Sequence, residues 1–399
     1  MDKPDRQISD VARGASRLAF AAVEQVANIV EAMHANIAAA SPPLGNGTDG
    51  RTRGIAGVVY ESIRLVNGAS RNVLDGALTL LPPLEASTLA QPQADAILSA
   101  VNGVLGDYLA LSGNPLSIPM RLRRKGEPLT LKRETLATAL PDANGKILIA
   151  VHGLCMSDRQ WYRKNHDHAA ALARDLGYTH VYLHYNSGRH VSENGREYAA
   201  LLEQLVAAWP VPVKEISVLS HSMGGLVTRS ACHYGAHDGQ RWREYLRRIV
   251  FLGTPHHGAP LERGGNWLQT ALGISPYTMP LSRLGWLRSS GITDLRYGNL
   301  LDDDWQDHDR FAPIGDVRLA VPLPKGVECY AIAATTGQDG GRLPGDGLVP
   351  VASALGIHED ASKALQFPES HRWISYHTNH LDLLANLKVY ARLLEWLGG

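Results

Sequence analysis

The stretch that decides the fold is SVLSHSMGGLVTRS, residues 217–230. Apolar residues at both ends flank a polar segment of small residues, and this pattern predicts a strand, a sharp turn and a helix, with Ser222 at the turn. Such a turn crowds the residues two positions before and after the serine, so both have to be small. They are Ser220 and Gly224, and the serine departs from the usual G-x-S-x-G pattern. The stretch is either an ordinary tight turn or one that presents Ser222 as a nucleophile.

A nucleophilic serine requires a histidine elsewhere in the chain. The hydroxyl is a weak nucleophile near neutral pH unless a base removes its proton during attack. The segment YHTNHLDLLANL, residues 376–387, places two histidines between the last expected strand and the last helix. We predict His380 as the base and keep His377 as the alternative.

The histidine in turn requires a carboxylate that fixes its tautomer and stabilises its positive charge. The segment LPGDGLVP, residues 343–350, follows an expected strand and holds Asp346 between two glycines. A sharp loop there can direct the carboxylate inward, so Asp346 is the predicted acid. Asp339 and Asp294 are the alternatives.

Catalysis by a serine nucleophile also needs hydrogen-bond donors for the oxyanion. The backbone N–H of Met223 follows the nucleophile at the start of the expected helix. A second N–H is expected from Leu154, in the loop after KILIAVHG. We expect Gly153 to permit an unusual backbone in that loop and His152 to hold it by hydrogen bonding.

The surrounding sequence predicts an α/β domain over residues 119–399. Short apolar runs alternate there with helical patterns, the order typical of a mainly parallel sheet. Strands are expected in MRLRRKGEPLTL, as a hairpin turning at Lys125-Gly126, and in KILIAVHG, THVYLHYNS, EISVLSHS, RRIVFLGTP and VECYAIAATTG. Helices are expected at about 167–176, 195–208, 224–234 and 381–397. The segment at about 260–325 is too long for an ordinary connection and is predicted to form an inserted cap.

Residues 1–118 are predicted to form a separate helical N-terminal region. Pro-, Gly- and Ser-rich segments separate three stretches with apolar residues at helical spacing. The stripes are Val23, Val26, Val30, Met33 and Ile37; Ile55, Val59, Val66 and Val73; and Ile97, Val101, Val104, Tyr108 and Leu111. Such stripes pack within a protein or lie on a membrane surface, and we expect the first.

The composition argues against several classes of protein. The chain has 39 basic and 39 acidic residues and no basic stripe, so a nucleic-acid partner is not expected. Its three cysteines are odd in number and far apart, which argues against a disulfide framework and fits a reducing compartment. The N-terminus is too charged for a secretory segment, and no apolar window is long enough to span a membrane. A soluble, cytoplasmic protein is therefore expected.

Five motifs in this order, AVHGL, SHSMGGL, GTPHHGAP, GDGLVP and NHLDLL, resemble the α/β-hydrolase superfamily of lipases and esterases. The similarity is greatest to bacterial lipases and the PGAP1-like group, and it covers about residues 120–399. It implies an α/β-hydrolase fold with a mainly parallel sheet. It also implies a Ser222, Asp346 and His380 triad, with Leu154 and Met223 as oxyanion donors.

The resemblance implies two further features. In these relatives GTPHHG lies beside the active site, so His256 and His257 are expected to shape the site rather than act as base. The HLD segment is similar to one whose aspartate binds structural calcium, which maps to Asp382. No acidic residue lies at the matching distance before Asp346, so no metal is predicted. The acidic cluster at 302–304 is expected to be a solvated loop.

These features predict a serine hydrolase that cleaves carboxylic esters through an acyl-enzyme, without a cofactor. The expected partner is a small-molecule or lipid ester, and peripheral membrane contact and the oligomeric state stay open. Apolar residues of the insert are candidates for a lid and acyl pocket or for the core of the cap: Trp267, Leu268, Leu272, Tyr277, Met279 and Trp286. An acyltransferase, thioesterase or amidase could use the same triad. A non-catalytic, membrane-associated binding protein is the alternative from another class.

Overall fold

The computed structural model describes residues 91–259, 289–307, 315–339, 341 and 343–399, with helical pieces at 13–21, 24, 28, 61–65, 67–70 and 72. Two compact units make up the chain, residues 1–90 with 111–116 and residues 91–110 with 117–399. The second unit carries the sheet. The division of the chain into domains at residue 118 stays a prediction.

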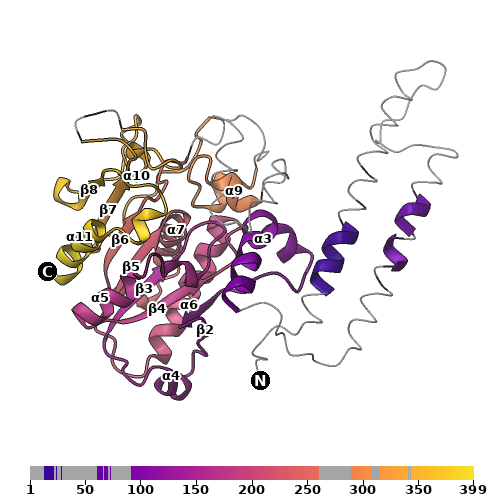
Figure 1. Cartoon of the computed structure of the whole chain (residues 1–399), viewed down its shortest axis with the longest axis horizontal. Helices are drawn as coiled ribbons and strands as arrows, with labels where there is room; N and C mark the ends of the chain where they lie inside the picture. Colours follow the sequence, from indigo (N-terminus) through magenta and orange to yellow (C-terminus); the bar gives the residue numbers. More distant parts are fainter. Residues whose placement is uncertain are drawn as a thin grey trace. The chain divides into compact units, whose positions relative to one another are not determined.

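An eight-stranded sheet forms the centre of the second unit (Figure 1). The strands are β1 Arg121–Arg124, β2 Glu127–Pro128, β3 Lys146–Val151, β4 Thr179–His184, β5 Glu215–His221, β6 Leu246–Leu252, β7 Glu328–Ala334 and β8 Arg372–Ser375. Their order is β2-β1-β4-β3-β5-β6-β7-β8. β1 runs antiparallel to β2 and β4, and the strands from β4 to β8 are parallel. This is an α/β-hydrolase fold, so the predicted fold class is confirmed.

The predicted hairpin lies at one edge of this sheet. β1 and β2 are joined by Lys125 and Gly126, which both adopt positive φ, 54° and 84°. Two consecutive residues of this kind are typical of a type I′ turn, whose twist matches that of paired strands. The sequence did not predict β8, a short strand at the other edge.

Helices cover both faces of the sheet (Figure 1). Among the described residues, the helices of this unit are α3 Gln91–Leu111, α4 Arg133–Ala139, α5 His168–Leu176, α6 Val191–Ala208, α7 Met223–His237, α9 Ser290–Asp294, α10 Val351–Ala354 and α11 Leu387–Gly398. Along β3, Ile147 and Ile149 join the cluster that contains residues of α6 and α7. Leu148 joins the opposite cluster, which contains residues of α5 and α11. Each fully buried aliphatic side chain contributes about 1.5–3 kcal/mol.

The final helix begins later than its sequence pattern predicts. A 3₁₀ turn, η6 Asp382–Leu384, comes first, and α11 starts at Leu387. Asn386 caps it, since its side chain accepts a hydrogen bond from the N–H of Lys388 at 2.9 Å. The shift leaves the preceding loop free to present His380.

The predicted helix around residues 97–111 is confirmed as α3, but among the residues of the apolar stripe only Val104 is fully buried. Tyr108 is 38% exposed and Leu111 is 90% exposed. The buried residues include Ser99, Asn102 and Val104, together with glycines. A helix that approaches loop backbone closely needs small residues at the contact. The other two apolar stripes lie outside the described residues.

The cap prediction can be followed only in part, because 260–288 and 308–314 lie outside the described residues, as do the six apolar candidates for a lid. The acidic cluster forms a 3₁₀ turn, η4 Asp302–Asp304. The Asp302 carboxylate pairs with Arg196, and one oxygen of Asp304 accepts hydrogen bonds from two backbone N–H groups at 2.8 and 2.9 Å. Asp304 is buried and structural, so the prediction of a wholly solvated loop was wrong there.

Within the described part of the chain, no helix combines the length and the apolar character that crossing a bilayer requires.

Candidate active site

Ser222 lies at a strained turn between β5 and α7. Its φ and ψ are 55° and −127°, a region that a residue with a side chain rarely adopts. Its N–H donates to the carbonyl of Leu252 at 2.9 Å, which holds the turn against the neighbouring strand. Such a conformation costs on the order of 1–3 kcal/mol and persists where the surroundings impose it. The turn places the hydroxyl beyond the end of the strand.

The neighbours of Ser222 are small for a steric reason. A Cβ on Gly224 would lie 2.5 Å from the carbonyl oxygen of His152. Ser220 is accommodated because its buried hydroxyl donates to the carbonyl of Val250 at 3.2 Å. The departure from G-x-S-x-G therefore creates no clash.

Asp346 lies in a sharp loop after β7, between two glycines with positive φ, 89° and 99°. One carboxylate oxygen accepts the N–H groups of Leu348 and Val349 at 2.9 and 2.8 Å. The other oxygen lies 2.7 Å from Nδ1 of His380. The loop thus fixes the carboxylate and leaves one oxygen for the imidazole.

His380 follows β8 and is 5% exposed. Because the carboxylate of Asp346 only accepts, Nδ1 of His380 donates, and this leaves the lone pair on Nε2. The backbone N–H of His380 also donates to the carbonyl of Asp346 at 3.0 Å. Asp346 therefore holds both the imidazole ring and the backbone of His380.

The structure separates His380 and Asp346 from their alternatives. His377 is exposed, with a φ of 51°, and Asp339 is also exposed. Asp294 is buried but lies 3.1 Å from Nδ1 of His190 and accepts the N–H of Val191 at 2.8 Å.

Ser222 and His380 line one narrow cleft with about 20 Å³ of free space. The other lining residues are Leu154, Met156, His221, Pro255, Ala259, Leu295, Leu348, Val349 and Leu381. Most of this wall is apolar, and the polar side chains on it are the serine and the two histidines.

The expected oxyanion donors flank this cleft. Met223 is the first residue of α7, so its N–H precedes the helix's own hydrogen-bond ladder. Leu154 lines the cleft directly. Between β3 and Leu154, a Cβ on Gly153 would lie 2.9 Å from Cβ of Ser222. The loop therefore approaches the serine as closely as glycine allows.

His152 holds that loop from beneath. Its Nδ1 donates to the carbonyl of Gly153 at 2.8 Å, and its Nε2 accepts the N–H of Tyr185 at 3.4 Å. The hydroxyl of Tyr185 donates to the carbonyl of His152 at 2.8 Å. Burial lowers the pKa of His152 to about 4, so the ring is neutral. His152 thus forms the hydrogen bonds expected of it, and its role in shaping an active site stays a prediction.

His221, inside the opening sequence stretch, supports the site in a way that the sequence did not indicate. Its Nε2 donates to the carbonyl of His380 at 3.0 Å, and the two ring centroids are 4.7 Å apart. Burial holds the pKa of His221 well below its ordinary value. The residue before Ser222 thus anchors the backbone of His380.

Helix α3 also supports the site. A Cβ on Gly103 would lie 2.1 Å from Sγ of Cys155, directly after Leu154. Cys155 has a φ of 58°, and its N–H donates to the hydroxyl of Ser187 at 3.0 Å. In the sequence, Gly103 and Gly106 of VNGVLG could have indicated this contact, since small residues spaced along a helix allow another segment to approach closely.

Comparisons with known proteins add the following. The model of a domain of unknown function, DUF7379, matches residues 119–295. No curated protein matches in sequence.

Among solved structures, the mature lipase BlEst2 of Bacillus licheniformis is 18% identical, with a TM-score of 0.40, over 62% of this chain and 91% of that chain. Lipase B of Aspergillus fumigatus is 14% identical, with a TM-score of 0.42, over 85% and 71%. Esterase Pf2001 of Pyrococcus furiosus is 15% identical, with a TM-score of 0.39, over 64% and 81%. At these values, statements about chemistry have to rest on the residues of this chain.

The two histidines of GTPHHG lie away from the cleft. His256 is fully buried against Phe251, with ring centroids 4.8 Å apart. The N–H of His257 donates to the hydroxyl of Ser353 at 3.1 Å. The residues of this loop that reach the cleft are Pro255 and Ala259, so any influence of the histidines on the site is indirect.

The described residues contain no group of three His, Cys, Asp or Glu side chains arranged to hold a metal ion. Asp382, which maps to a calcium ligand in the resemblance, pairs instead with Nζ of Lys164 at 2.6 Å.

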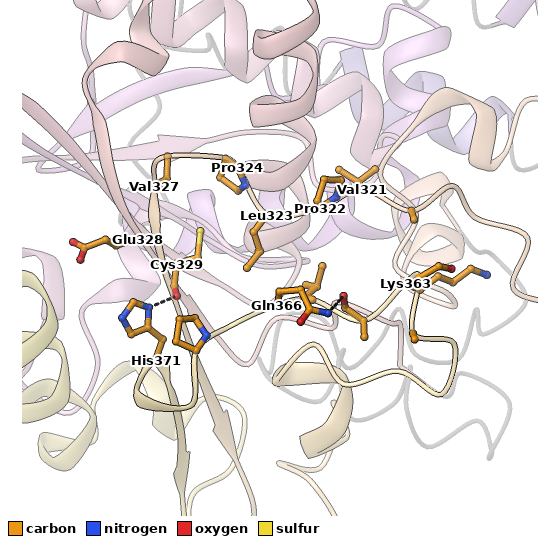
Figure 2. Close-up of a pocket in the computed structure, with 16 residues that line it drawn as sticks. Val321, Pro322, Leu323, Pro324, Val327, Glu328, Cys329, Lys363, Gln366 and His371 are labelled. Atoms are coloured by element: carbon orange, nitrogen blue, oxygen red, sulfur yellow. Dashed lines mark hydrogen bonds between the residues drawn. The ribbon is translucent and has the colours of Figure 1, made fainter.

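A much larger cavity, about 640 Å³, lies between residues 320–329 and 361–371 (Figure 2). Figure 2 shows Glu328 and Lys363 at opposite ends of it. His371 is engaged with the carbonyl of Cys329 at 3.1 Å. Burial raises the pKa of the Cys329 thiol, so this cysteine is not activated as a nucleophile. Size alone does not identify the reactive site.

Proposed function

We propose that this protein is a serine hydrolase that cleaves carboxylic esters through an acyl-enzyme. The observation that supports it is the 2.7 Å contact between Asp346 and His380, together with the cleft that His380 lines with Ser222, which lies at a strained turn. A carboxylate, an imidazole with a free Nε2 and a hydroxyl at the end of a strand are the components of a catalytic triad.

The proposed reaction has two halves. His380 Nε2 takes the proton of Ser222 as Oγ attacks the ester carbonyl, and the N–H groups of Leu154 and Met223 stabilise the oxyanion. His380 then gives this proton to the leaving alcohol, and the acyl group stays on Ser222. In the second half, His380 takes a proton from water, whose oxygen attacks the acyl carbon. The acid leaves, and the proton returns to Ser222.

The substrate class follows from the lining of the cleft. The described wall is mainly apolar and carries no charged side chain apart from the catalytic groups. An apolar acyl chain loses less hydration there than a polar one, so we propose esters with apolar acyl chains, including lipid esters. The acyl-enzyme does not determine the acceptor, so product analysis with water and alcohol distinguishes hydrolysis from acyl transfer. A cytoplasmic location, with or without peripheral membrane contact, stays a prediction.

Active-site labelling tests the proposal. A fluorophosphonate probe is expected to label the wild-type protein, and Ser222→Ala is expected to abolish labelling. Ser370→Ala, at an exposed position, is the matched control and should retain it. A series of p-nitrophenyl esters then measures the preference for chain length. Persistent labelling of Ser222→Ala, or no turnover of any ester or thioester, would refute the proposal.

A further inference from the structure

A buried arginine on α7 has no ionic partner. Arg229 is 4% exposed, and none of the described carboxylates forms an ion pair with it. Its Nη2 donates to the carbonyl of Val321, and its Nη1 lies 3.5 Å from Nδ1 of His256. Its Nε has no hydrogen-bond partner in the described part of the chain. An unpaired buried guanidinium is costly, so it calls for a compensating charge.

The arginine lines a small cavity beneath the GTPHHG loop. About 10 Å³ is open to the centre of a water-sized particle, which is room for one such particle. The lining includes His256 and His257 from the loop after β6, Asp304 from η4, and Arg318 and Lys363 from two further segments. His256 is fully buried, and its Nε2 has no partner among the described residues.

The other charges around the cavity are engaged elsewhere. Arg318 and Lys363 share the carboxylate of Asp316, at 2.8 and 3.4 Å. The oxygens of Asp304 accept three backbone N–H groups at 2.8 to 3.1 Å. The three cations are Arg229, Arg318 and Lys363, and the two carboxylates are Asp304 and Asp316. Together they leave one positive charge in excess.

We propose that this cavity binds one small monovalent anion of the halide class, such as chloride, between Arg229 and His256. The excess charge matches one negative charge. The small space suits a single-atom anion better than the larger phosphate, sulfate or carboxylate groups. A halide accepts hydrogen bonds. The guanidinium of Arg229 and the imidazole of His256 each have a nitrogen without a partner among the described residues, and both can donate. Burial lowers the pKa of Arg229 to about 9 and holds that of His256 well below its ordinary value, so Arg229 is charged and His256 neutral at pH 7.

The site would fasten two elements of the candidate active site to each other. Arg229 belongs to the helix that begins directly after Ser222, and His256 follows Pro255, which lines the cleft. The proposal does not depend on the hydrolase activity, because protein stability measures it without any substrate.

Thermal unfolding at constant ionic strength tests it. We expect the midpoint in sodium chloride or bromide to exceed that in sodium gluconate by roughly 2 °C, since a ligand that binds only the folded state stabilises it. In Arg229→Gln the difference between halide and gluconate should vanish, because the excess charge is gone. Arg248→Gln is the matched control, since Arg248 pairs with Glu328 at 3.0 Å away from this cavity. It should keep the halide effect.

Equal midpoints in halide and gluconate, or an undiminished halide effect in Arg229→Gln, would overturn the proposal. If Arg229→Gln does not fold, Lys363→Gln at the wall of the cavity replaces it. This variant should need at least threefold more halide for half of the stabilisation, and an unchanged requirement would contradict the site. Bromide in crystals of the wild-type protein should give an anomalous peak beside Arg229, and its absence would equally count against the proposal.

Discussion

His380 is held by Asp346 twice, through Nδ1 on one carboxylate oxygen at 2.7 Å and through its backbone N–H on the carbonyl at 3.0 Å. The first contact selects the tautomer of the imidazole, and the second fixes the backbone from which the side chain extends. Two separate loops are thus joined at the cleft that His380 lines with Ser222. A mutation of Asp346 is therefore expected to act through His380.

Asp346→Asn is expected to lower kcat by a factor on the order of 10³–10⁴ while the protein stays folded. An amide can donate to Nδ1 and thereby stabilise the tautomer that carries its proton on Nε2, where the lone pair is needed. Steady-state ester hydrolysis measures the effect. The control is Asp339→Asn at an exposed position. Activity of Asp346→Asn within tenfold of wild type would exclude Asp346 as the triad acid.

Gly153→Ala is expected to lower kcat by roughly 10²-fold, because its Cβ would lie 2.9 Å from Cβ of Ser222 and push the nucleophile from its position. Gly315→Ala is the matched control, since no atom lies within 4 Å of its new Cβ. Circular dichroism would show that both variants keep their secondary structure. Full activity of Gly153→Ala would mean that the loop yields without moving the serine.

Acid is expected to destabilise the fold through buried neutral histidines. Burial lowers the pKa of His168 to about 4, whereas the unfolded chain binds this proton from about pH 6.5 downward. The unfolded state therefore takes up more protons, and stability falls as the pH drops from 6.5 towards 4. For His168 alone the loss between pH 6.5 and 5 is about 1.6 kcal/mol.

Urea unfolding at pH 7 and pH 5 measures this slope. His168→Gln should reduce the difference between the two pH values, since glutamine can still donate to the carbonyl of Leu383 that His168 contacts at 2.8 Å. His237→Gln, at an exposed position of α7, should leave the difference unchanged. An identical slope in wild type and His168→Gln would contradict the assignment.

The three cysteines are expected to resist thiol reagents in the native protein. All are buried, and burial raises the pKa of the thiols of Cys155 and Cys232 to about 12. Iodoacetamide at pH 8 should modify them in urea but not in buffer, and ester hydrolysis should survive the treatment. Rapid native modification with loss of activity would indicate that a thiol takes part in the reaction.

The strands from β3 to β7 were predictable because they are mainly apolar runs bounded by turn residues, whereas β1 and β2 were predictable from the turn between them. The turn at Ser222 was predictable for a related reason, since steric crowding restricts the residues around Ser222 to small ones. β8 escaped prediction because it is a short edge strand, and three of its four residues are only half-buried.

The supports of the candidate site were harder to predict than its reacting groups. The hydrogen bond from His221 to the carbonyl of His380 joins residues that only the fold brings together. The buried face of α3 carries small and polar residues beside Val104 and Leu109, because part of it meets loop backbone, whereas periodicity detects faces that are apolar throughout. The anchoring of Asp346 by neighbouring N–H groups was local and could be expected from its glycine-rich loop.

The contact between α3 and the loop after β3 determines how far the protein can be shortened without loss of support for the candidate site. Gly103 and Gly106 lie against Cys155 and Asn186, and the carbonyl of Gly106 accepts a hydrogen bond from Asn186 at 2.9 Å. A protein shortened to start at residue 119, where the family match begins, would keep every reacting group and lose the surface on which the Leu154 loop rests. Shortened proteins made for crystallisation or for selection of new activities should therefore begin before Gln91.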